Sequence, residues 1–528
     1  MDVDRLELPS GRDESVHHRA HADCAPAPYP GGSLWPHLRQ SPAVGQHRLD
    51  LSDPPCGCDG RPAGYRLGAR RHRVLDNRSV RIRNPLPQAC GASPRTGKRG
   101  CRPVKCLLLG SGATVHALAW KLISEPEVQE VFCIPGNAGT ALLLGPPPVP
   151  PDARLPDWAF AHPIDLVVAS GPHHWVETFV DLHLPTLGPT EAAQGALAGR
   201  QALRQILGRA GLHGAEGETF SELDMAERYV ASRPLPLWVR SESGPWHEAM
   251  LVRDRHTAFL EVARVFRQAG GSAVSVERAY AGRPVSFALL TDGSEAIPFG
   301  VARIALHRGD SDTGPLTEGM GAWASWEHAQ LEARLFEEVG QPLLATLRAE
   351  GLLRPGFLQL RLTLTAERAV VDDLVWGLDD LHAAALLPLW EGELAPLLRA
   401  AAQGRMEGGP PRWRRAYTVA VALVSAGYPA RPQTGQPVYG LEEVEALVFH
   451  QATRLRPAHA GSLWSAPFAT RRREESAPCE VVAEGGRVLF AVGTGRDLQQ
   501  ARAQAMAALR EIRCAHAAWR NDIGGETS

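Results

Sequence analysis

Two glycine turns, near residues 110 and 136, are suited to binding a phosphorylated substrate. Gly110 and Gly112 follow one short apolar run, and Gly136 and Gly139 follow another. Glycine lets backbone N–H groups approach phosphate oxygens, and it tolerates positive φ angles. The alternative is that these glycines form ordinary strand-to-helix turns. For Gly110 and Gly112 taken alone, the sequence leaves both interpretations open.

A second segment combines carboxylates with turn-forming residues near the middle of the chain. Asp310 and Asp312 open the run Asp310-Ser311-Asp312-Thr313-Gly314-Pro315-Leu316-Thr317-Glu318-Gly319-Met320-Gly321. So many turn-forming residues around two aspartates are hard to explain by core packing. This segment therefore indicates a function more strongly than the glycine turns do.

The elements before residue 170 follow the pattern of an open parallel sheet. Short apolar runs at Cys106–Leu109, Val131–Ile134 and Asp165–Ala169 predict strands, and His116–Ser124 predicts a helix. Strand, glycine turn, helix and strand in this order are typical of such a sheet. The proline-rich stretch Gly145–Pro156 is predicted to be a loop.

The rest of the chain alternates predicted helices and strands. The helices are Gln201–Ala210 and Leu223–Ser232, and the strands are Leu235–Arg240, Val285–Thr291, Phe357–Thr363 and Ala369–Leu374. Because apolar and polar residues alternate in Phe357–Thr363, we predict a half-buried strand there. A last unit, Tyr417–Gly524, closes with the Ala-rich helix Leu498–Ile512.

Length and charge narrow the class of protein. A chain of 528 residues with 44% hydrophobic content is long enough for three or four structural units. A formal net charge of -2 gives no basic field for nucleic acid, so we expect small molecules or proteins as partners. No apolar run reaches the length of a membrane span, and the N-terminus lacks the apolar stretch of a signal peptide. We therefore expect a cytoplasmic protein with no membrane or nucleic-acid partner.

The N-terminal 103 residues differ from the rest. They are rich in Pro, Gly, Arg and His and show no lasting apolar period. Two interpretations stay open: residues 1–103 are a disordered extension, or they are not translated naturally. Cys56 and Cys58 lack a second pair at metal-ligand spacing, so the scattered cysteines are expected to be reduced thiols.

Motifs along most of the chain occur in the order that one family shows. They are Gly110–Lys121, Cys133–Thr140, Leu187–Thr190, Gly309–Trp323, Gly427–Pro429, Phe449–His450, Gly485–Leu489 and Arg520–Gly524. From about Val104 to Gly524 the chain resembles phosphoribosylamine–glycine ligase, the ATP-grasp enzyme of purine synthesis. The resemblance implies an α/β fold in four parts. Residues 104–203 would form a Rossmann-like, pre-ATP-grasp domain with an open parallel sheet. Residues 204–272 and 273–415 would form the small and large lobes of a two-part ATP-grasp domain. Residues 416–524 would form an α+β domain.

The resemblance also implies a reaction and a set of site residues. ATP, glycine and 5-phosphoribosylamine would give glycinamide ribonucleotide, ADP and phosphate, with Mg (or Mn) as the metal. By resemblance, Asp310 and Asp312 are catalytic, Arg200, Arg240 and Glu277 bind ATP, and Asp373 binds the metal. The implied substrate-binding residues are Gly110, Gly112, Gly136, Asn137, Gly139, Thr313, Gly314, Pro315, Gly319, Met320 and Gly321.

Several positions depart from the family pattern. Arg200 and Arg240 stand where the family has lysines, and the lid segment Ser241–Glu248 contains Pro245 and Trp246 instead of glycines around a lysine. Val375 offers no oxygen where the family has a metal-binding asparagine. Simpler roles stay open for these residues. The two arginines would then lie at the surface, and Asp372, Asp373, Asp379 and Asp380 would form acidic loop edges.

Three functions remain in view. The first is a working ligase, and the second is a catalytically inactive paralogue that acts as a binding or regulatory protein. The third is a ligase with a changed nucleotide or acceptor. Losing metal oxygens and cationic clamps together costs several factors of ten in rate, so the chemistry favours the second. Arg520, Asp522 and Gly524 either face the active-site cleft or pack the last helix.

Overall fold

The computed structural model describes residues 103–145, 149, 154–244, 248–268, 273–406, 411–457 and 479–525. All of them belong to one compact unit, Leu75–Ser528. The predictions made for the N-terminal extension and for Pro245 and Trp246 lie outside the described residues. Among the described helices, none is both long enough and apolar enough to cross a membrane.

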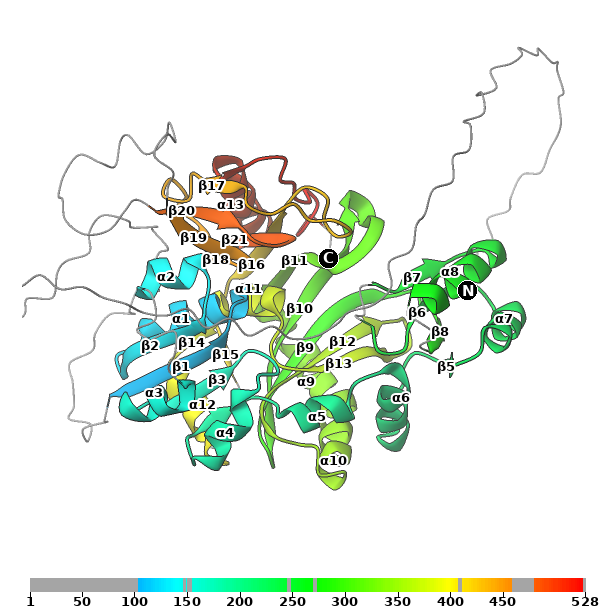
Figure 1. The fold of residues 1–528 in the computed structure, drawn as a ribbon, viewed down its shortest axis with the longest axis horizontal. Helices are drawn as coiled ribbons and strands as arrows, with labels where there is room; N and C mark the ends of the chain where they lie inside the picture. Colours follow the sequence, from blue (N-terminus) through cyan, green and yellow to red (C-terminus); the bar gives the residue numbers. More distant parts are fainter. Residues whose placement is uncertain are drawn as a thin grey trace, which may run out of the picture. The chain divides into compact units, whose positions relative to one another are not determined.

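The N-terminal part is a four-stranded parallel sheet, as predicted. Its strands are β1 (Val104–Gly110), β2 (Val128–Pro135), β3 (Leu166–Ala169) and β4 (Thr186–Leu187), in the order β2-β1-β3-β4 (Figure 1). Its helices are α1 (Ala113–Ile123), α2 (Ala138–Leu144), α3 (Leu155–Ala161) and α4 (Trp175–Asp181). Because the strands are parallel, their carboxyl ends meet at one edge of the sheet.

The predicted loop Gly145–Pro156 is wrong at its last two residues. Leu155 and Pro156 begin α3. Proline is tolerated in the first turn of a helix because the N–H that it lacks would have no partner inside the helix.

Both faces of the parallel sheet are buried, which explains the continuous apolar run Cys106–Leu109 in β1. Leu107 and Leu109 pack with Trp158 and Phe179 on one face. Leu108 lies on the other face, in the core that contains α1. Alternate residues of a strand point to opposite faces, so a strand covered on both sides reads as a continuous apolar run.

A small antiparallel sheet follows. Its strands are β5 (Gly217–Phe220), β6 (Leu237–Ser241), β7 (Met250–Val252) and β8 (Val274–Arg278), in the order β5-β8-β6-β7. The helices α7 (Leu223–Ser232) and α8 (Arg255–Gln268) pack in its core through Val230 and Val262. Before this sheet lie α5 (Glu191–Ala196) and α6 (Arg200–Arg209). The strand β8 follows the expected boundary after residue 272 and pairs within this small sheet.

The central element is an antiparallel sheet of eight strands. They are β9 (Arg283–Asp292), β10 (Ala296–Gly309), β11 (Thr313–Ser325), β12 (Pro355–Leu364), β13 (Ala369–Trp376), β16 (Tyr417–Val424), β18 (Leu447–His450) and β21 (Arg487–Gly495). Their order is β13-β12-β9-β10-β11-β16-β21-β18. Strands from the expected large lobe and from the expected C-terminal domain therefore form one sheet.

The strand predicted at Phe357–Thr363 is confirmed within β12, but the prediction that it is half-buried is wrong. Phe357 lies in one hydrophobic core, and Leu358 and Leu360 lie in another, so both faces of β12 are covered. Gln359 is also buried. Its amide nitrogen donates to Ser286 Oγ at 2.6 Å, and its oxygen accepts from Asp379 N at 2.5 Å. The polar residue that suggested exposure is thus satisfied inside the protein.

The remaining helices flank the central sheet. They are α9 (Ala329–Leu335), α10 (Gln341–Ala349), α11 (Asp380–Leu386), α12 (Ala395–Ala402) and α13 (Leu498–Glu511), with the short turns η2 (Asp310–Asp312), η3 (Trp326–His328), η4 (Phe336–Gly340) and η5 (Leu387–Leu389). Two further small sheets are β14 (Trp390–Glu391) with β15 (Arg412–Trp413), and β19 (Thr453–Pro457), β20 (Cys479–Ala483), β17 (Pro437–Tyr439) and β22 (Arg513–Cys514). The predicted last helix is confirmed, except that Ile512 is its cap and the chain continues into β22.

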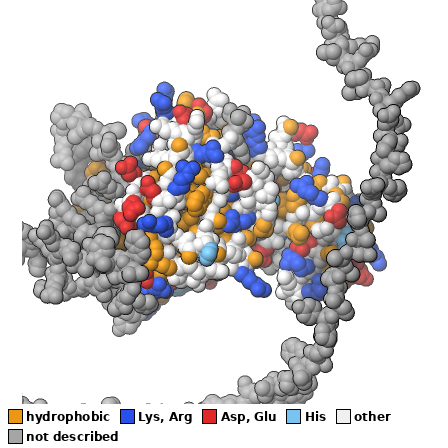
Figure 2. Space-filling view, turned by 90° about the horizontal axis from the view of Figure 1, so that it is seen from above, with side chains coloured by type: hydrophobic (Ala, Val, Ile, Leu, Met, Phe, Trp, Pro, Cys, Tyr) orange, Lys and Arg blue, Asp and Glu red, His pale blue; other side chains and the backbone are white. Residues whose placement is uncertain are grey.

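The surface carries both signs of charge. On the face drawn in Figure 2, acidic and basic side chains are interspersed with apolar ones. This mixture agrees with the small formal net charge of the sequence.

Candidate functional site

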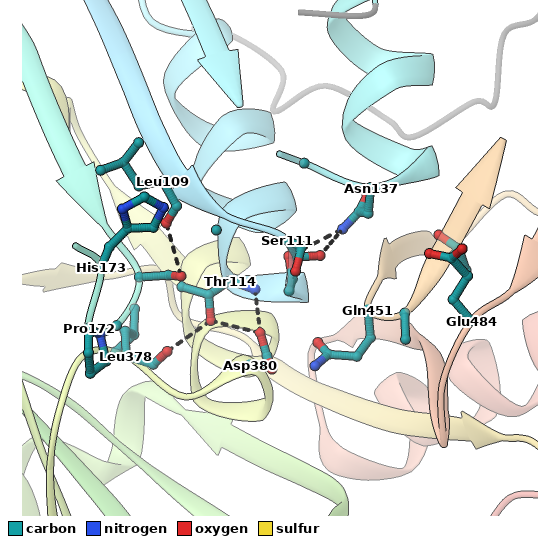
Figure 3. Close-up of a pocket in the computed structure, with 17 residues that line it drawn as sticks. Leu109, Ser111, Thr114, Asn137, Pro172, His173, Leu378, Asp380, Gln451 and Glu484 are labelled. Atoms are coloured by element: carbon teal, nitrogen blue, oxygen red, sulfur yellow. Dashed lines mark hydrogen bonds between the residues drawn. The ribbon is translucent and has the colours of Figure 1, made fainter. Parts of the chain in front are cut away.

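A polar cavity of about 580 Å³ lies at the carboxyl ends of the parallel strands (Figure 3). Three segments of the parallel-sheet part line it, and the rest of its lining comes from farther along the chain. The lining segments are Leu109–Gly112, Gly136–Asn137, Ser170–His173 and Gln451–Thr453, with Thr114, Leu378, Asp380 and Glu484. Loops at this edge of a parallel sheet commonly bind ligands.

The structure brings four of the predicted substrate-binding residues together in this cavity. Gly110, Gly112, Gly136 and Asn137 all line it. Gly136 adopts a φ of 69°, which glycine tolerates better than other residues. Gly139 is not among the lining residues, and a side chain there would collide with the buried ring of His116. Gly139 therefore packs closely against His116, and its role in substrate binding stays a prediction.

Asn137 fixes the loops around the cavity. Its side-chain oxygen accepts from Thr140 N at 3.0 Å and caps α2. Its amide nitrogen donates to Ser111 O and to His450 O, both at 2.8 Å. One amide therefore connects the turn after β1, the start of α2 and the end of β18.

The first turn of α1 is already capped by side chains. Thr114 N donates to Asp380 Oδ1 at 2.8 Å, and Ala113 N donates to Gln451 Oε1 at the same distance. Burial raises the pKa of the Asp380 carboxyl, and Arg487, 3.5 Å away, opposes that rise. These two helix amides are engaged inside the protein, so a ligand phosphate would have to use other donors of the glycine turns.

Sequence reasoning missed several polar residues that line the cavity, and three of them lie in loops. His173, Gln451 and Glu484 reach the cavity from loops after β3, β18 and β20, and Figure 3 shows His173 and Glu484 on opposite sides of Ser111. Burial lowers the pKa of His173, and its neighbour His174 adds to that effect. The available signals were weak: His173 follows a Gly-Pro pair after a strand, and Gln451 follows the Phe449–His450 motif.

The segment from Asp310 to Gly321 lies elsewhere. None of its residues lines the cavity. Asp310 and Asp312 lie in an exposed turn between β10 and β11, and Thr313, Gly314 and Pro315 are the exposed first residues of β11. Met320 and Gly321 are buried within the central sheet, and Gly319 adopts a φ of 111°. The predicted catalytic pair and the glycine-turn cavity are therefore separate features of this structure.

The last residues of the chain hold this exposed turn. Arg520 donates to Asp312 Oδ1 at 2.7 Å, Ser311 N donates to Asp522 Oδ2 at 2.7 Å, and Asn521 N donates to Asp310 Oδ1 at 2.8 Å. Burial alone would raise the pKa of Asp522, but bonds from Arg520 and Ser311 N lower it to about 2. Arg520 and Asp522 thus bind the turn between β10 and β11. The sequence had suggested that they face the active-site cleft or pack the last helix, and neither interpretation described this contact.

The residues predicted to bind ATP also meet, in a buried cluster of charges. Glu277 on β8 accepts from Arg200 Nε on α6 at 2.8 Å, and Arg240 on β6 pairs with its other oxygen. Arg204, one helical turn after Arg200, contacts Glu277 at 2.8 Å. The interpretation of Arg200 and Arg240 as surface residues is wrong, since their side chains are only 6% and 7% exposed.

The charge cluster continues to β13 and α11. Arg361 Nη1 lies 3.2 Å from Asp373 Oδ2, and its Nη2 lies 3.4 Å from Asp379 Oδ2. Asp372, a partly buried residue of β13, accepts from Thr363 Oγ1, and desolvation raises its pKa to about 6. Asp372 and Asp373 therefore belong to a strand, and the interpretation of these two residues as a loop edge is wrong.

The residues present do not fit a Mg²⁺ site. Asp373 Oδ2 pairs with Arg361, and Arg200 lies 3.7 Å from Asp373 Oδ1. Val375, in the same strand, contributes no side-chain oxygen. Among the described residues, no group of three or more His, Cys, Asp or Glu side chains is arranged to hold a metal ion. Magnesium requires several oxygen ligands in near-octahedral geometry, and arginines take their place here.

Comparison with known families gives one consistent result. Successive parts of the chain match the phosphoribosylglycinamide synthetase N domain (residues 104–195), its ATP-grasp (A) domain (198–374) and its C domain (418–526). A phosphoribosylamine–glycine ligase from Xanthomonas axonopodis pv. citri is 30% identical over 442 residues, covering 80% of this chain and 97% of the relative. One from Rhizobium meliloti is 29% identical over 435 residues, covering 80% and 98%.

Solved structures give the same fold. The crystal structure of phosphoribosylamine–glycine ligase from Thermotoga maritima aligns with a TM-score of 0.64 and 22% identity, covering 80% of this chain and 100% of that one. The biotin carboxylase domain of Hydrogenobacter thermophilus 2-oxoglutarate carboxylase aligns with a TM-score of 0.52 and 10% identity, covering 78% and 91%. At these identities the likeness concerns the fold alone.

Proposed function

This chain belongs to the phosphoribosylamine–glycine ligase family, and we propose that it takes part in that family's step of purine biosynthesis. In that step, glycine is joined to 5-phosphoribosylamine at the expense of ATP. Homologues and the three matched domains indicate this ligase activity. ATP and a divalent metal are the cofactors that the ATP-grasp domain implies.

The observation that carries the proposal is the cavity at the carboxyl ends of β1, β2 and β3. Its volume of about 580 Å³ falls within the range of small-molecule sites. Gly110, Gly112 and Gly136 give a ligand close access to backbone, and His173 and Glu484 offer groups that hydrogen-bond sugar hydroxyls or an amine. We assign the ribosyl part of 5-phosphoribosylamine to this cavity.

A second candidate is a relative that binds the acceptor without turning over ATP. The specific observation in its favour is that carboxylates of the same chain engage Arg200, Arg204, Arg240 and Arg361. Phosphoryl transfer is catalysed by cations and metal that neutralise developing charge. Such a protein would act in binding or regulation while keeping the fold.

One pair of measurements separates the candidates. Ribose 5-phosphate binding is measured by calorimetry, and ADP release is measured with glycine, Mg-ATP and 5-phosphoribosylamine formed in place from ribose 5-phosphate and ammonia. ADP release that needs both glycine and acceptor supports the ligase. Acceptor binding without ADP release supports the second candidate, and failure to bind ribose 5-phosphate contradicts the proposal.

A matched pair of glycine variants locates the binding. A Cβ at Gly171 would meet no atom within 4 Å, and Gly171 lines the cavity. A leucine there would reduce the space for a ligand, so Gly171→Leu is expected to weaken ribose 5-phosphate binding at least tenfold. Gly195 on α5 is equally uncrowded and does not line the cavity, so Gly195→Leu is the control. If both variants bind ribose 5-phosphate with equal affinity, the acceptor must bind at another site.

A further inference from the structure

Three arginines converge on one carboxylate of this chain. Arg200 contacts both oxygens of Glu277, at 2.8 and 3.1 Å, Arg204 contacts one oxygen at 2.8 Å, and Arg240 pairs with the other. The Glu277 side chain is fully buried, at 0% exposure. A guanidinium that holds both carboxylate oxygens presents the same planar fork that it would present to a phosphate.

Rigid elements hold this cluster in place. In the pairing of β6 with β8, Trp238 lies opposite Glu277, and Arg240 lies opposite Ser275. Arg200 begins α6, and its Nη1 donates to Asp372 O on β13 at 2.7 Å. The cluster therefore connects the small sheet with the central sheet. These contacts place the carboxylate and the three guanidiniums without a flexible loop.

One polar atom of the cluster is left without a partner. Three guanidiniums contact Glu277, and Arg200 also lies 3.7 Å from Asp373, but Arg240 Nε, although buried, has no hydrogen-bond partner in the described structure. Burial alone would raise the pKa of Glu277, but Arg240 and Arg200 lower it to about 2, so the group is ionised at neutral pH. Several buried guanidiniums that converge on one carboxylate, with one donor unpartnered, form an environment that a more highly charged anion would also fit.

We infer that Glu277 is an internal anion which competes with a polyphosphate ligand for Arg200, Arg204 and Arg240. The inference rests on the family assignment of this region to the nucleotide, and it does not depend on the acceptor cavity. In the unmodified protein the carboxylate holds the guanidiniums and weakens nucleotide binding. When the carboxylate charge is removed, the same three side chains form a polyphosphate site.

The test compares Glu277→Gln with the unmodified protein, using tripolyphosphate without metal as the probe. Glutamine keeps the shape and one acceptor oxygen but removes the charge. We expect tripolyphosphate to bind Glu277→Gln at least tenfold more tightly than the unmodified protein by calorimetry. The anion should also raise the thermal unfolding midpoint of the variant and leave that of the unmodified protein unchanged.

Glu261→Gln is the matched control. Glu261 is also buried, on α8, but it pairs with one arginine, Arg264, at 2.7 Å and lies outside the cluster. This variant should gain no affinity for tripolyphosphate. A second variant, Glu277→Asp, keeps the negative charge and should also show no gain.

Three results would overturn the inference. The first is a folded Glu277→Gln protein that binds tripolyphosphate no more tightly than the unmodified protein. The second is that the unmodified protein binds tripolyphosphate, or Mg-ATP, as tightly as Glu277→Gln binds the same ligand. If Glu277→Gln unfolds on its own, tripolyphosphate should restore its near-UV circular dichroism, and failure to do so is the third. Ribose 5-phosphate binding to the same samples reports on the acceptor cavity separately.

Discussion

Two buried glutamates of this protein illustrate how neighbouring groups determine the protonation state of a single residue. Glu277 is surrounded by guanidiniums, and its pKa is lowered to about 2. Glu332 on α9 is also buried, and the indole Nε1 of Trp413 donates to it at 3.2 Å. Burial raises the pKa of Glu332 to about 7, because this hydrogen bond offsets only part of the lost hydration of its charge.

This difference predicts a pH-dependent stability. The pKa of Glu332 is about 7 in the folded protein and near 4.5 when unfolded. The folded state therefore binds more protons between these values, and the free energy of unfolding falls as pH rises from about 4.5 to about 7. Glu332→Gln removes the ionisable group. We expect it to stabilise the protein at pH 8 by up to roughly 3 kcal/mol, with little effect near pH 4.

Thermal unfolding of both proteins from pH 4 to pH 8 measures this effect. Glu337→Gln is the control, because Glu337 is exposed in the neighbouring turn. Parallel pH profiles for the unmodified protein and Glu332→Gln would contradict the assignment of the titration to Glu332.

At the scale of elements, the start of α1 shows how distant segments complete one another. Asp380, which begins α11, caps α1 through Thr114 N at 2.8 Å and Thr114 Oγ1 at 3.0 Å. Gln451, after β18, caps the same helix through Ala113 N. The cavity depends on this arrangement, since Asp380 and Gln451 both line it.

Gly112 is required here for close approach. Its φ of -78° suits any residue, but a Cβ would lie 2.5 Å from Asp380 Oδ1. Gly112→Ala should therefore displace the cap, destabilise the protein by about 1–3 kcal/mol and weaken ribose 5-phosphate binding. Urea unfolding measures the loss. Gly171 lines the same cavity, and a Cβ there would contact no atom, so Gly171→Ala should leave the free energy of unfolding nearly unchanged. Equal stability of the two variants would refute this explanation.

Much of the fold could be predicted because local pattern determines it. The helix Leu223–Ser232 has the predicted bounds, and the strands at Cys106–Leu109 and Val285–Thr291 lie within β1 and β9. The glycine turns identified one wall of the cavity. Burial of Gln359 and Arg200 could not be predicted, since it depends on partners distant in sequence, Ser286 and Glu277. His173 and Glu484 were missed for the same reason: only the folded chain brings their loops together.

One hydrophobic core is shared by three parts of the described unit. Leu118 and Trp120 of α1 lie in the same hydrophobic cluster as Ala322 of β11, Ala420 of β16 and Phe490 of β21. The parallel sheet, the large lobe and the C-terminal strands therefore bury their apolar surfaces together. The matched domains are units of sequence, but residues of all three contribute to this one core.

The shared sheet predicts that the C-terminal strands cannot be removed without loss of the rest. Residues Gly321–Ser325 of β11 pair with Tyr417–Val421 of β16, and β16 pairs with β21. A chain that stops at Arg415 leaves β11 as an open edge and uncovers Met320 and Ala322, which are at most 1% exposed in the full chain. An exposed apolar edge strand favours aggregation. We expect this shortened chain to aggregate and to lack the near-UV circular dichroism of the full chain, measured together with sedimentation. If the shortened chain is instead a monomer with a native-like spectrum, the large lobe folds by itself, and the common core contributes less than its burial indicates.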